Sequence, residues 1–338
     1  MTMRTGLALM ALMVAGVAGL AMKDETSGRL LVAVKGAQSL AIVDAGSGKV
    51  AASVPEGAAG KDTGHELTAS KDGKRAFVPI YGDSGVGKPG SDGREMVVID
   101  VASQKVVGKV DFGHPVRPHL PVLNSRDGLL YVTTELDKSV TIVDPVSLKI
   151  VGSVPTGSEQ SHMLAISHDG KRGYTANVGP GTVSVLDLMG RKTVTVIPVA
   201  KQTQRISVSV DDKLVFTSDQ TKPELVVIDT ATNAVVKRIA MAGTGYGTAP
   251  TPDGKWLLVP MMDVNKVAVI DLKAMSVARN IDLAAGTHPQ EALVRPDGKA
   301  AYVSCDHSGQ VAEIDTATWT VRRMIDTGKL SDGLAWAK

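Results

Sequence analysis

Short runs of apolar residues recur along the chain, and many of them end at an aspartate. Strand-forming residues precede the aspartate in runs such as 96–99 and 267–270. The residues after it are turn-like, as at 230–233, and a second alternating run follows at 234–239. Alternation with a period of two predicts a strand, a tight turn and another strand. The aspartates that end these runs are Asp44, Asp100, Asp144, Asp187, Asp229, Asp271 and Asp315.

A second turn signal lies ahead of most of these aspartates. It is an Asp-Gly pair, and glycine accepts the positive φ that a tight hairpin needs. An apolar strand pattern follows each pair, as at 130–133. The pairs begin at Asp72, Asp127, Asp169, Asp253 and Asp297, and Asp211-Asp212 takes their place in one repeat. Each repeat therefore predicts four short strands and three turns.

The spacing of the repeat predicts the fold. Successive aspartates lie 42 to 44 residues apart after a first interval of 56, and no helical period recurs. Four antiparallel strands in a repeat of this length are typical of a β-propeller. A single sheet cannot bury both faces, so the repeats must stack around an axis. We expect an all-β, seven-bladed β-propeller with four antiparallel strands per blade.

The two ends of the chain complement each other. Residues 332–338 resemble the innermost-strand pattern of 65–71, and residues 28–54 look like a blade that lacks this strand. We expect the C-terminal strand to pair into the N-terminal blade, because pairing removes exposed sheet edges.

The long first interval contains a glycine-rich stretch at 81–94. Residues 82–88 match the spacing of a phosphate-binding loop, but Pro89 stands where a hydroxyl should bind Mg²⁺. No helical pattern follows to offer its N-terminus to a phosphate. We therefore interpret 81–94 as a hairpin insertion in one blade.

The N-terminus has the pattern of an export signal. Arg4 precedes an apolar stretch at 6–18, and small residues follow at 19 and 21. This predicts a signal peptide at 1–21, a single domain at 22–338, and a periplasmic or secreted protein without a transmembrane segment after cleavage. The lone cysteine, Cys305, allows no internal disulfide, and we expect a buried, inert thiol. Covalent c-type haem needs two cysteines, whereas non-covalent haem stays open.

Charge and composition exclude some partners. The net charge is +2 without a basic tail, and aromatic residues are 3% of the chain, so nucleic acid is not indicated. We expect a monomer whose partner is a small molecule or a periplasmic protein.

Two segments carry a family resemblance. Residues 131–134 (Tyr-Val-Thr-Thr) and 174–177 (Tyr-Thr-Ala-Asn), each followed by a valine-rich strand ending in aspartate, resemble the YVTN repeat. The chain is thus similar, over about 28–338, to the YVTN or YncE-like propeller family and to related lactonase-type and cytochrome d1-type propellers. The resemblance implies the seven-bladed fold, but propellers host many activities.

The start of each innermost strand should open onto the central channel. Counting back seven residues from each turn gives one position per blade, and a further candidate, His119, directly precedes one of them. These positions are His65, Leu120, His162, Gln204, Tyr246, Gln290 and Asp332. Three of the candidates are histidines from successive blades.

The histidines suggest a metal. Converging imidazoles of His65, His119 and His162 would suit a divalent transition metal such as Zn, Cu or Fe. Glu66 or Glu291 would then act as acid or base.

A polar ligand pocket is the alternative, and so is a plain solvated channel. Gln204, Arg205, Tyr246, Gln290 and Asp332 would line the pocket, and Arg205 with Tyr246 would suit an anionic or carbonyl-bearing ligand. Two hypotheses about function remain open. One is an exported binding or scaffold propeller that uses its channel mouth. The other is a metal-dependent hydrolase or lyase of the lactone or ester type.

Overall fold

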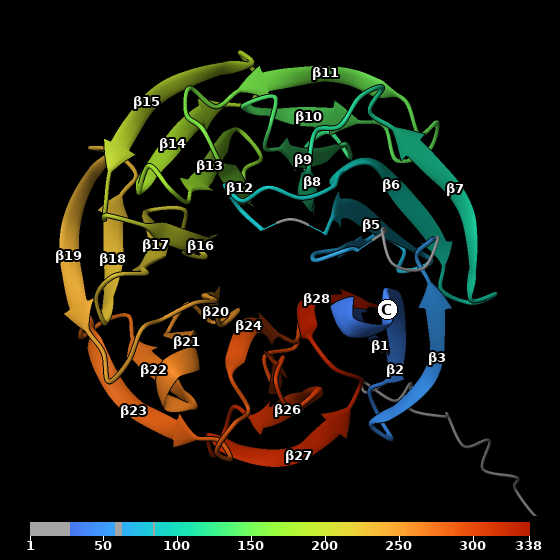
Figure 1. The fold of residues 1–338 in the computed structure, drawn as a ribbon. Coiled ribbons are helices and arrows are strands. Elements are labelled where there is room, and N and C mark those ends of the chain that lie inside the picture. Colours follow the sequence, from blue (N-terminus) through green and yellow to red (C-terminus); the bar gives the residue numbers. More distant parts are fainter. Residues whose placement is uncertain (1–27, 58–62, 84) are drawn as a thin grey trace, which may run out of the picture.

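Seven four-stranded sheets surround a central axis (Figure 1). The computed structural model describes residues 28–57, 63–83 and 85–338, and within them 28 strands form these sheets. The expected all-β, seven-bladed propeller is confirmed. The predicted signal peptide, residues 1–21, lies outside the described residues. No helix in the described ranges is both long and apolar enough to span a membrane.

In blades 2 to 7 the strands run from the axis to the rim in chain order, whereas blade 1 begins at the axis with the last strand. Blade 1 contains β28 (Ser331–Ala337), β1 (Arg29–Val34), β2 (Ser39–Asp44) and β3 (Lys49–Pro55). Blade 2 contains β4 (Thr68–Ala69), β5 (Arg75–Gly82), β6 (Asp92–Asp100) and β7 (Lys105–Asp111). Blade 3 contains β8 (Pro118–Leu123), β9 (Leu130–Thr134), β10 (Ser139–Val143) and β11 (Ile150–Pro155). Blade 4 contains β12 (Ser161–Ile166), β13 (Arg172–Asn177), β14 (Thr182–Asp187) and β15 (Lys192–Pro198).

Blades 5 to 7 follow the same order. Blade 5 contains β16 (Thr203–Val208), β17 (Leu214–Asp219), β18 (Glu224–Asp229) and β19 (Ala234–Ala240). Blade 6 contains β20 (Ala249–Pro250), β21 (Trp256–Met261), β22 (Lys266–Asp271) and β23 (Ser276–Asp282). Blade 7 contains β24 (Pro289–Val294), β25 (Ala300–Cys305), β26 (Gln310–Asp315) and β27 (Thr320–Asp326). Two 3₁₀ turns, η1 (Lys35–Ala37) and η2 (Met262–Val264), join the second and third strands of their blades.

The recurring aspartates shape the outermost hairpins. Asp229 Oδ1 accepts hydrogen bonds from the backbone N–H groups of Ala231 and Thr232, at 3.1 and 2.8 Å. Asp315 does the same for Ala317 and Thr318. Such a side chain mimics a backbone turn, and this is why the sequence repeats an aspartate where the third strand of a blade ends.

Strand β28 occupies the innermost position of blade 1. It pairs antiparallel with β1, with Arg29 opposite Ala337 and Val32 opposite Leu334. Seven hydrophobic clusters fill the spaces between neighbouring blades, and one of them joins the last blade to the first. In that cluster Leu334 packs with Tyr302, which is fully buried. The ring is therefore held by apolar packing at every interface in the described part of the chain.

Each innermost strand carries one extra residue relative to its neighbour. In β8, Pro118 lies opposite Thr134 but Pro121 lies opposite Val132, so three steps on β8 match two on β9. Such a β-bulge turns a strand locally and re-aims its side chains. The bulges enclose His65 and Glu66; His119 and Leu120; His162; Gln204 and Arg205; Tyr246 and Gly247; Gln290 and Glu291; and Asp332 and Gly333.

The glycine-rich insertion joins β5 to β6. Both strands run further than expected, so Tyr81 belongs to β5 and Arg94 to β6, and residues 83 and 85–91 are the described part of the connection. The Arg117 guanidinium donates to the carbonyl oxygens of Lys88 and Gly85, at 2.7 and 3.4 Å. The insertion therefore lies beside the start of β8, on the face where the bulged strands begin.

Cys305 ends β25 and is fully buried. Burial raises the pKa of its thiol to about 12, which keeps the sulfur protonated and unreactive at neutral pH. This agrees with the buried, inert thiol expected from the sequence.

The contact between β28 and the last blade yields a stability prediction. Leu334→Ala removes a side chain that is 8% exposed in the cluster joining the two ends, so we expect the free energy of unfolding to fall by about 2–5 kcal/mol. Leu330→Ala, four residues earlier at an exposed position, should change it by less than about 0.5 kcal/mol. Denaturant unfolding followed by circular dichroism measures both variants. Equal losses would contradict this role for β28.

Candidate functional site

The bulges bring two groups of side chains together at the channel mouth. We call His65, His119, His162, Tyr81 and Glu135 the histidine cluster. We call Arg205, Lys35, Glu66, Glu291 and Asp332 the arginine cluster. Most of these side chains come from the bulged strands, whereas Tyr81 is the last residue but one of β5, Glu135 follows β9 and Lys35 begins η1.

Aromatic rings form the core of the histidine cluster. The rings of His119 and His162 stack with centroids 3.5 Å apart, and His65 meets His119 edge-on at 5.6 Å. Tyr81 contacts all three histidines, with centroid distances of 4.9 to 5.4 Å. The three histidines expected to converge are therefore neighbours in the structure.

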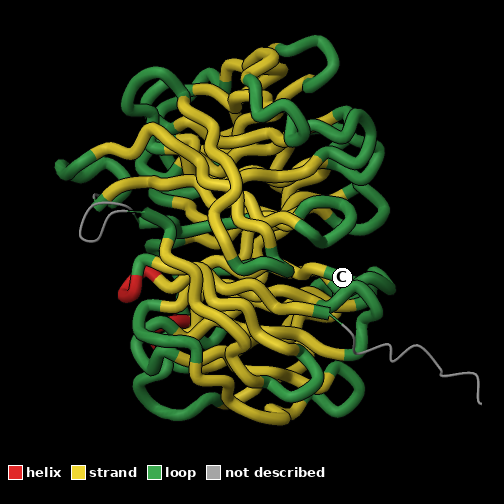
Figure 2. The backbone as a smooth tube through the Cα atoms, turned by 90° about the vertical axis from the view of Figure 1, so that its right-hand side faces the viewer, coloured by secondary structure: helices red, strands yellow, loops and turns green. Residues whose placement is uncertain are grey.

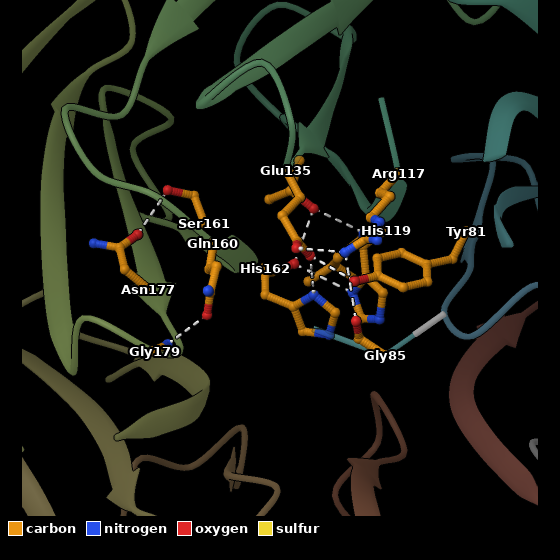
Figure 3. A network of polar contacts seen from close by, with 12 residues as sticks. Tyr81, Gly85, Arg117, His119, Glu135, Gln160, Ser161, His162, Asn177 and Gly179 are labelled. Atoms are coloured by element: carbon orange, nitrogen blue, oxygen red, sulfur yellow. Dashed lines mark hydrogen bonds and ion pairs between the residues drawn. The ribbon is translucent and has the colours of Figure 1, made fainter. Parts of the chain in front are cut away.

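Hydrogen bonds orient two of the imidazoles (Figure 3). His162 Nδ1 donates to Glu135 Oε2 at 3.2 Å, and His119 Nδ1 donates to the backbone oxygen of His162, also at 3.2 Å. Carboxylate and carbonyl oxygens only accept, so the proton of each neutral ring sits on Nδ1 and the lone pair on Nε2. An imidazole held in this way can bind a metal through Nε2.

Glu135 is the centre of this network. It also accepts a hydrogen bond from the Tyr81 hydroxyl at 2.6 Å, and Arg117 lies 3.4 Å from its other oxygen. Burial alone would raise the pKa of Glu135, but the contacts with His162, Tyr81 and Arg117 lower it, so the carboxylate stays ionised. Burial lowers the pKa of all three histidines, that of His65 to about 3, so the rings are neutral at pH 7.

Hydroxyl groups of the second strands satisfy the backbone at the bulges. Thr133 Oγ1 accepts from the N–H of Leu120 at 3.0 Å and donates to the carbonyl oxygen of His162 at 2.9 Å. Thr217 donates to the carbonyl of Arg205, and Ser304 accepts from the N–H of Glu291. Thr133 is the threonine of the Tyr-Val-Thr-Thr segment, so this part of the repeat motif has a structural role next to the site.

Arg205 is surrounded by carboxylates of the chain itself. Its guanidinium contacts Glu66, Glu291 at 2.7 Å and Asp332 at 2.9 Å, and the Lys35 ammonium lies 2.7 Å from Asp332. Arg205 was expected to receive an anionic ligand, but its nitrogens already bind internal anions. Two cations face three carboxyl groups in the arginine cluster, so its positive charges are already paired within the chain.

The three carboxylates differ in their preference for a proton. Burial raises the pKa of Glu66 well above its usual range, against the attraction of Arg205, and burial also raises that of Glu291. Burial acts on Asp332 as well, but Lys35 and Arg205 lower its pKa to about 2. Asp332 is thus the firmly ionised partner, and Glu66 and Glu291 readily hold a proton.

Most remaining polar candidates line the same mouth. The Tyr246 ring lies under Arg205 at 5.1 Å, and Gln204 donates to its hydroxyl at 3.0 Å. Gln290, by contrast, donates its amide to Asp306 at 2.6 Å. The expected ligand-binding residues thus divide between the channel and a neighbouring loop.

The histidine cluster does not form a closed set of metal ligands. Among the described residues, the group whose ligand atoms all lie within 4.8 Å of one another is a different one, formed by His288, Asp306 and His307. His119 and His162 lie face to face as a stacked pair, and each ring would bind a metal through its own Nε2.

Sequence reasoning missed Tyr81, Arg117, Glu135 and Lys35. They lie at strand ends or in turns, where no period marks them, and only the ring brings them to the mouth. Arg117 and Glu135 share a backbone hydrogen bond at the end of the β8–β9 pair. Arg117 and Glu135 directly flank the ends of two strands that pair with each other. Comparing such flanking positions between the repeats could have revealed these two residues.

The arginine cluster predicts a strong pH-dependent effect of Arg205→Met. The variant leaves three buried carboxylates with one ammonium, so we expect it to lose about 3–5 kcal/mol of stability at pH 7.5. Without Arg205 the carboxylate pKa values rise, so the loss should shrink as the pH falls and these groups take up protons. Glu66→Gln, which keeps an oxygen acceptor and removes excess negative charge, should have little effect at pH 7.5. Urea unfolding at several pH values measures both, and equal losses would refute the assignment.

The low pKa of His119 predicts an acid-side loss of stability. The unfolded chain takes up a proton on this histidine near pH 6.5, whereas the buried ring does not. Stability therefore falls as the pH drops below about 6.5, by about 1.4 kcal/mol per pH unit for this one group. His119→Gln should lessen the slope of unfolding free energy against pH by that amount between pH 6 and 5. Parallel curves for the two proteins would contradict it.

Comparisons with known proteins place this geometry in context. The protein YncE of Escherichia coli, from strains K12 and O157:H7, is 26% identical over 196 residues, which is 56% of this chain and 54% of the relative. The chain thus spans about half the length of the curated relatives it matches. This match supports the YncE-like resemblance seen in the repeats.

Two solved structures share the fold. Hydrazine synthase of Kuenenia stuttgartiensis superposes with a TM-score of 0.70 at 19% identity, over 90% of this chain and 99% of that one. Dihydro-heme d1 dehydrogenase NirN in complex with DHE superposes with a TM-score of 0.66 at 15% identity, over 93% of this chain and 76% of that one. At these identities the likeness is one of fold.

A sequence profile decides the family. The profile of the cytochrome D1 heme domain matches residues 90–205 and 180–337, which together span blades 3 to 7 and the closing strand. Because that span is well over half of the sequence, the chain belongs to the cytochrome D1 heme domain family.

Proposed function

We propose that this protein is a binding propeller that holds a heme-class tetrapyrrole at its channel mouth through the histidine cluster. The observation that carries the proposal is the orientation of His119 and His162. Each uses Nδ1 on an oxygen of the chain and keeps Nε2 for an external partner. The name of the family and that of NirN, a dihydro-heme d1 dehydrogenase, support the choice of ligand.

The donor set fits iron in a tetrapyrrole. Neutral imidazole nitrogen is a common axial ligand of heme iron, and a hydrogen bond from the other ring nitrogen raises its basicity. Glu135 gives His162 such a partner, and Tyr81 and Arg117 hold Glu135 in place. His119 or His162 would hold the iron through Nε2, and the bound iron would supply redox chemistry.

Charge limits how the ligand can lie. The cations of the arginine cluster, Arg205 and Lys35, are already paired with carboxyl groups of the chain, so ligand carboxylates are disfavoured there. A cavity of about 390 Å³ adjoins Arg117 and Glu135, and Lys88 and Lys138 also line it. Lys138 pairs with Glu159 at 2.8 Å, so Lys88 is the lysine that would meet a ligand carboxylate on this side of the histidine cluster.

We further propose that the protein acts outside the cytoplasm, in the periplasm or as a secreted protein. The apolar stretch at 6–18 followed by small residues supports export.

A hemin titration of the apoprotein tests the binding site. We expect saturable binding of one hemin per chain with a shifted Soret band. The double variant H119A/H162A should weaken binding at least tenfold, because it removes both oriented Nε2 groups. His168→Ala is the matched control, since His168 forms a similar pair with Asp212 at 2.7 Å but is 54% exposed on a distant turn.

Three outcomes would decide against this proposal. One is a titration without saturation, and another is a double variant that binds hemin like the wild type. The third is a wild-type protein that binds one Zn²⁺ or Cu²⁺ per chain but no hemin, together with a double variant that does not bind this ion. That result would favour the alternative of a metal ion held directly by His65, His119 and His162.

A further inference from the structure

A second group of histidines lies in blade 7. His288 directly precedes β24, whereas Asp306 and His307 directly follow β25. Because Pro289 pairs with Cys305, the antiparallel register brings these loop residues together at one end of the blade. The N–H of Asp306 donates to the carbonyl of His288 at 3.3 Å, as Glu135 does to Arg117 in blade 3. The group therefore lies on the same face as the channel mouth.

Three potential ligand atoms are close to one another here. His288 Nδ1 lies 2.6 Å from Asp306 Oδ1, and His307 Nε2 lies 3.8 Å from the same oxygen. The two imidazole rings stack almost parallel, with centroids 4.0 Å apart and an angle of 6°. One ligand atom from each residue can be chosen so that all lie within 4.8 Å of one another. Two nitrogens and one carboxylate oxygen form a donor set that first-row transition metals prefer.

Neighbouring side chains fix the carboxylate. Gln290, itself 7% exposed, donates to Asp306 Oδ2 at 2.6 Å, which leaves Oδ1 facing the imidazoles. The other amide atom, Gln290 Oε1, is buried without a hydrogen-bond partner in the described ranges. Asn265 Oδ1 accepts from the backbone N–H of His288 at 3.0 Å and holds the loop in position. Such outer contacts orient metal ligands in proteins.

The group differs from other histidine–aspartate pairs of the chain. His114 pairs with Asp137 at 2.9 Å and His168 with Asp212 at 2.7 Å, and both histidine side chains are more than half exposed. In blade 7 the aspartate is 7% exposed and has a second histidine beside it. A buried carboxylate between two imidazoles with one open side attracts a cation more strongly than a solvated pair does.

We propose that His288, Asp306 and His307 form a binding site for a divalent transition-metal ion, separate from the histidine cluster of the channel. To bind the ion through Nδ1, the neutral His288 ring would carry its proton on Nε2, and the ion would take the place of the direct contact between His288 Nδ1 and Asp306 Oδ1. His307, which is 59% exposed, would complete the set from the solvent side and leave further positions open to water or a ligand. The site does not depend on heme binding.

Calorimetric titration of the metal-free, full-length protein with Zn²⁺ or Co²⁺ tests the site. We expect binding of one ion per chain, a rise in melting temperature, and, for Co²⁺, visible absorption bands of a low-coordinate site. His307→Ala should weaken binding at least tenfold without affecting the fold, because this side chain is exposed. Gln160 directly precedes β12 of blade 4, as His288 precedes β24, so His288→Gln introduces a residue that this position accepts. The double variant H288Q/H307A should bind the metal more weakly still.

Two controls separate this site from others. His168→Ala tests a lone histidine–aspartate pair and should leave the titration unchanged. The variant H119A/H162A should also keep the metal, so a failure of heme binding and a failure of this site give different results. Metal binding that persists in H288Q/H307A, or no binding at micromolar concentrations of the ion, would overturn the proposal.

Discussion

The extra residue in every innermost strand is the constraint on which the channel mouth depends. In a regular strand, side chains alternate between the two faces of the sheet, and both faces of a blade pack against neighbouring blades. A bulge interrupts this alternation for one step and turns a side chain toward the axis. His162, Arg205 and Asp332 reach the mouth in this way. The seven core clusters stay intact because the register recovers after each bulge.

Each bulge leaves backbone groups that need partners. Hydroxyl groups such as Thr133 and Ser304 provide some of them, and contacts between blades provide others. Gly333 donates its N–H to the carbonyl of His65, and Gly247 donates to that of Gln290, each at 2.9 Å. A Cβ atom on Gly333 would lie 2.6 Å from Glu66 Oε2, so only glycine fits this approach. The same small features that build the repeat therefore also set the distance between site residues.

The sequence predicted the blades because their signals are local. Asp229 and its equivalents shape one turn each, and the Asp-Gly pairs mark another, so the spacing revealed the number of sheets. Counting back from those turns also found the bulge positions, including His65, His162 and Asp332.

Pairing at the mouth was beyond local reasoning. Arg205 contacts Glu66 and Asp332, which lie 139 and 127 residues away in the chain. The closed ring of blades brings these three residues together, and no local sequence pattern shows this. From the sequence alone, Arg205 therefore looked available for a ligand. No local pattern joins His307 to His288 either, since strand pairing brings the two together.

The end of β28 has a consequence for the use of this protein. A Cβ atom on Gly73 would lie 2.4 Å from the backbone oxygen of Lys338, so the last residue packs against the first hairpin of blade 2. Figure 2 shows this end on the side of the ring opposite the short η1 turn that carries Lys35. An affinity tag or surface tether joined to Lys338 would attach the molecule through the face opposite the channel mouth. The entrance would then face the solution, in the orientation that surface-based binding assays require.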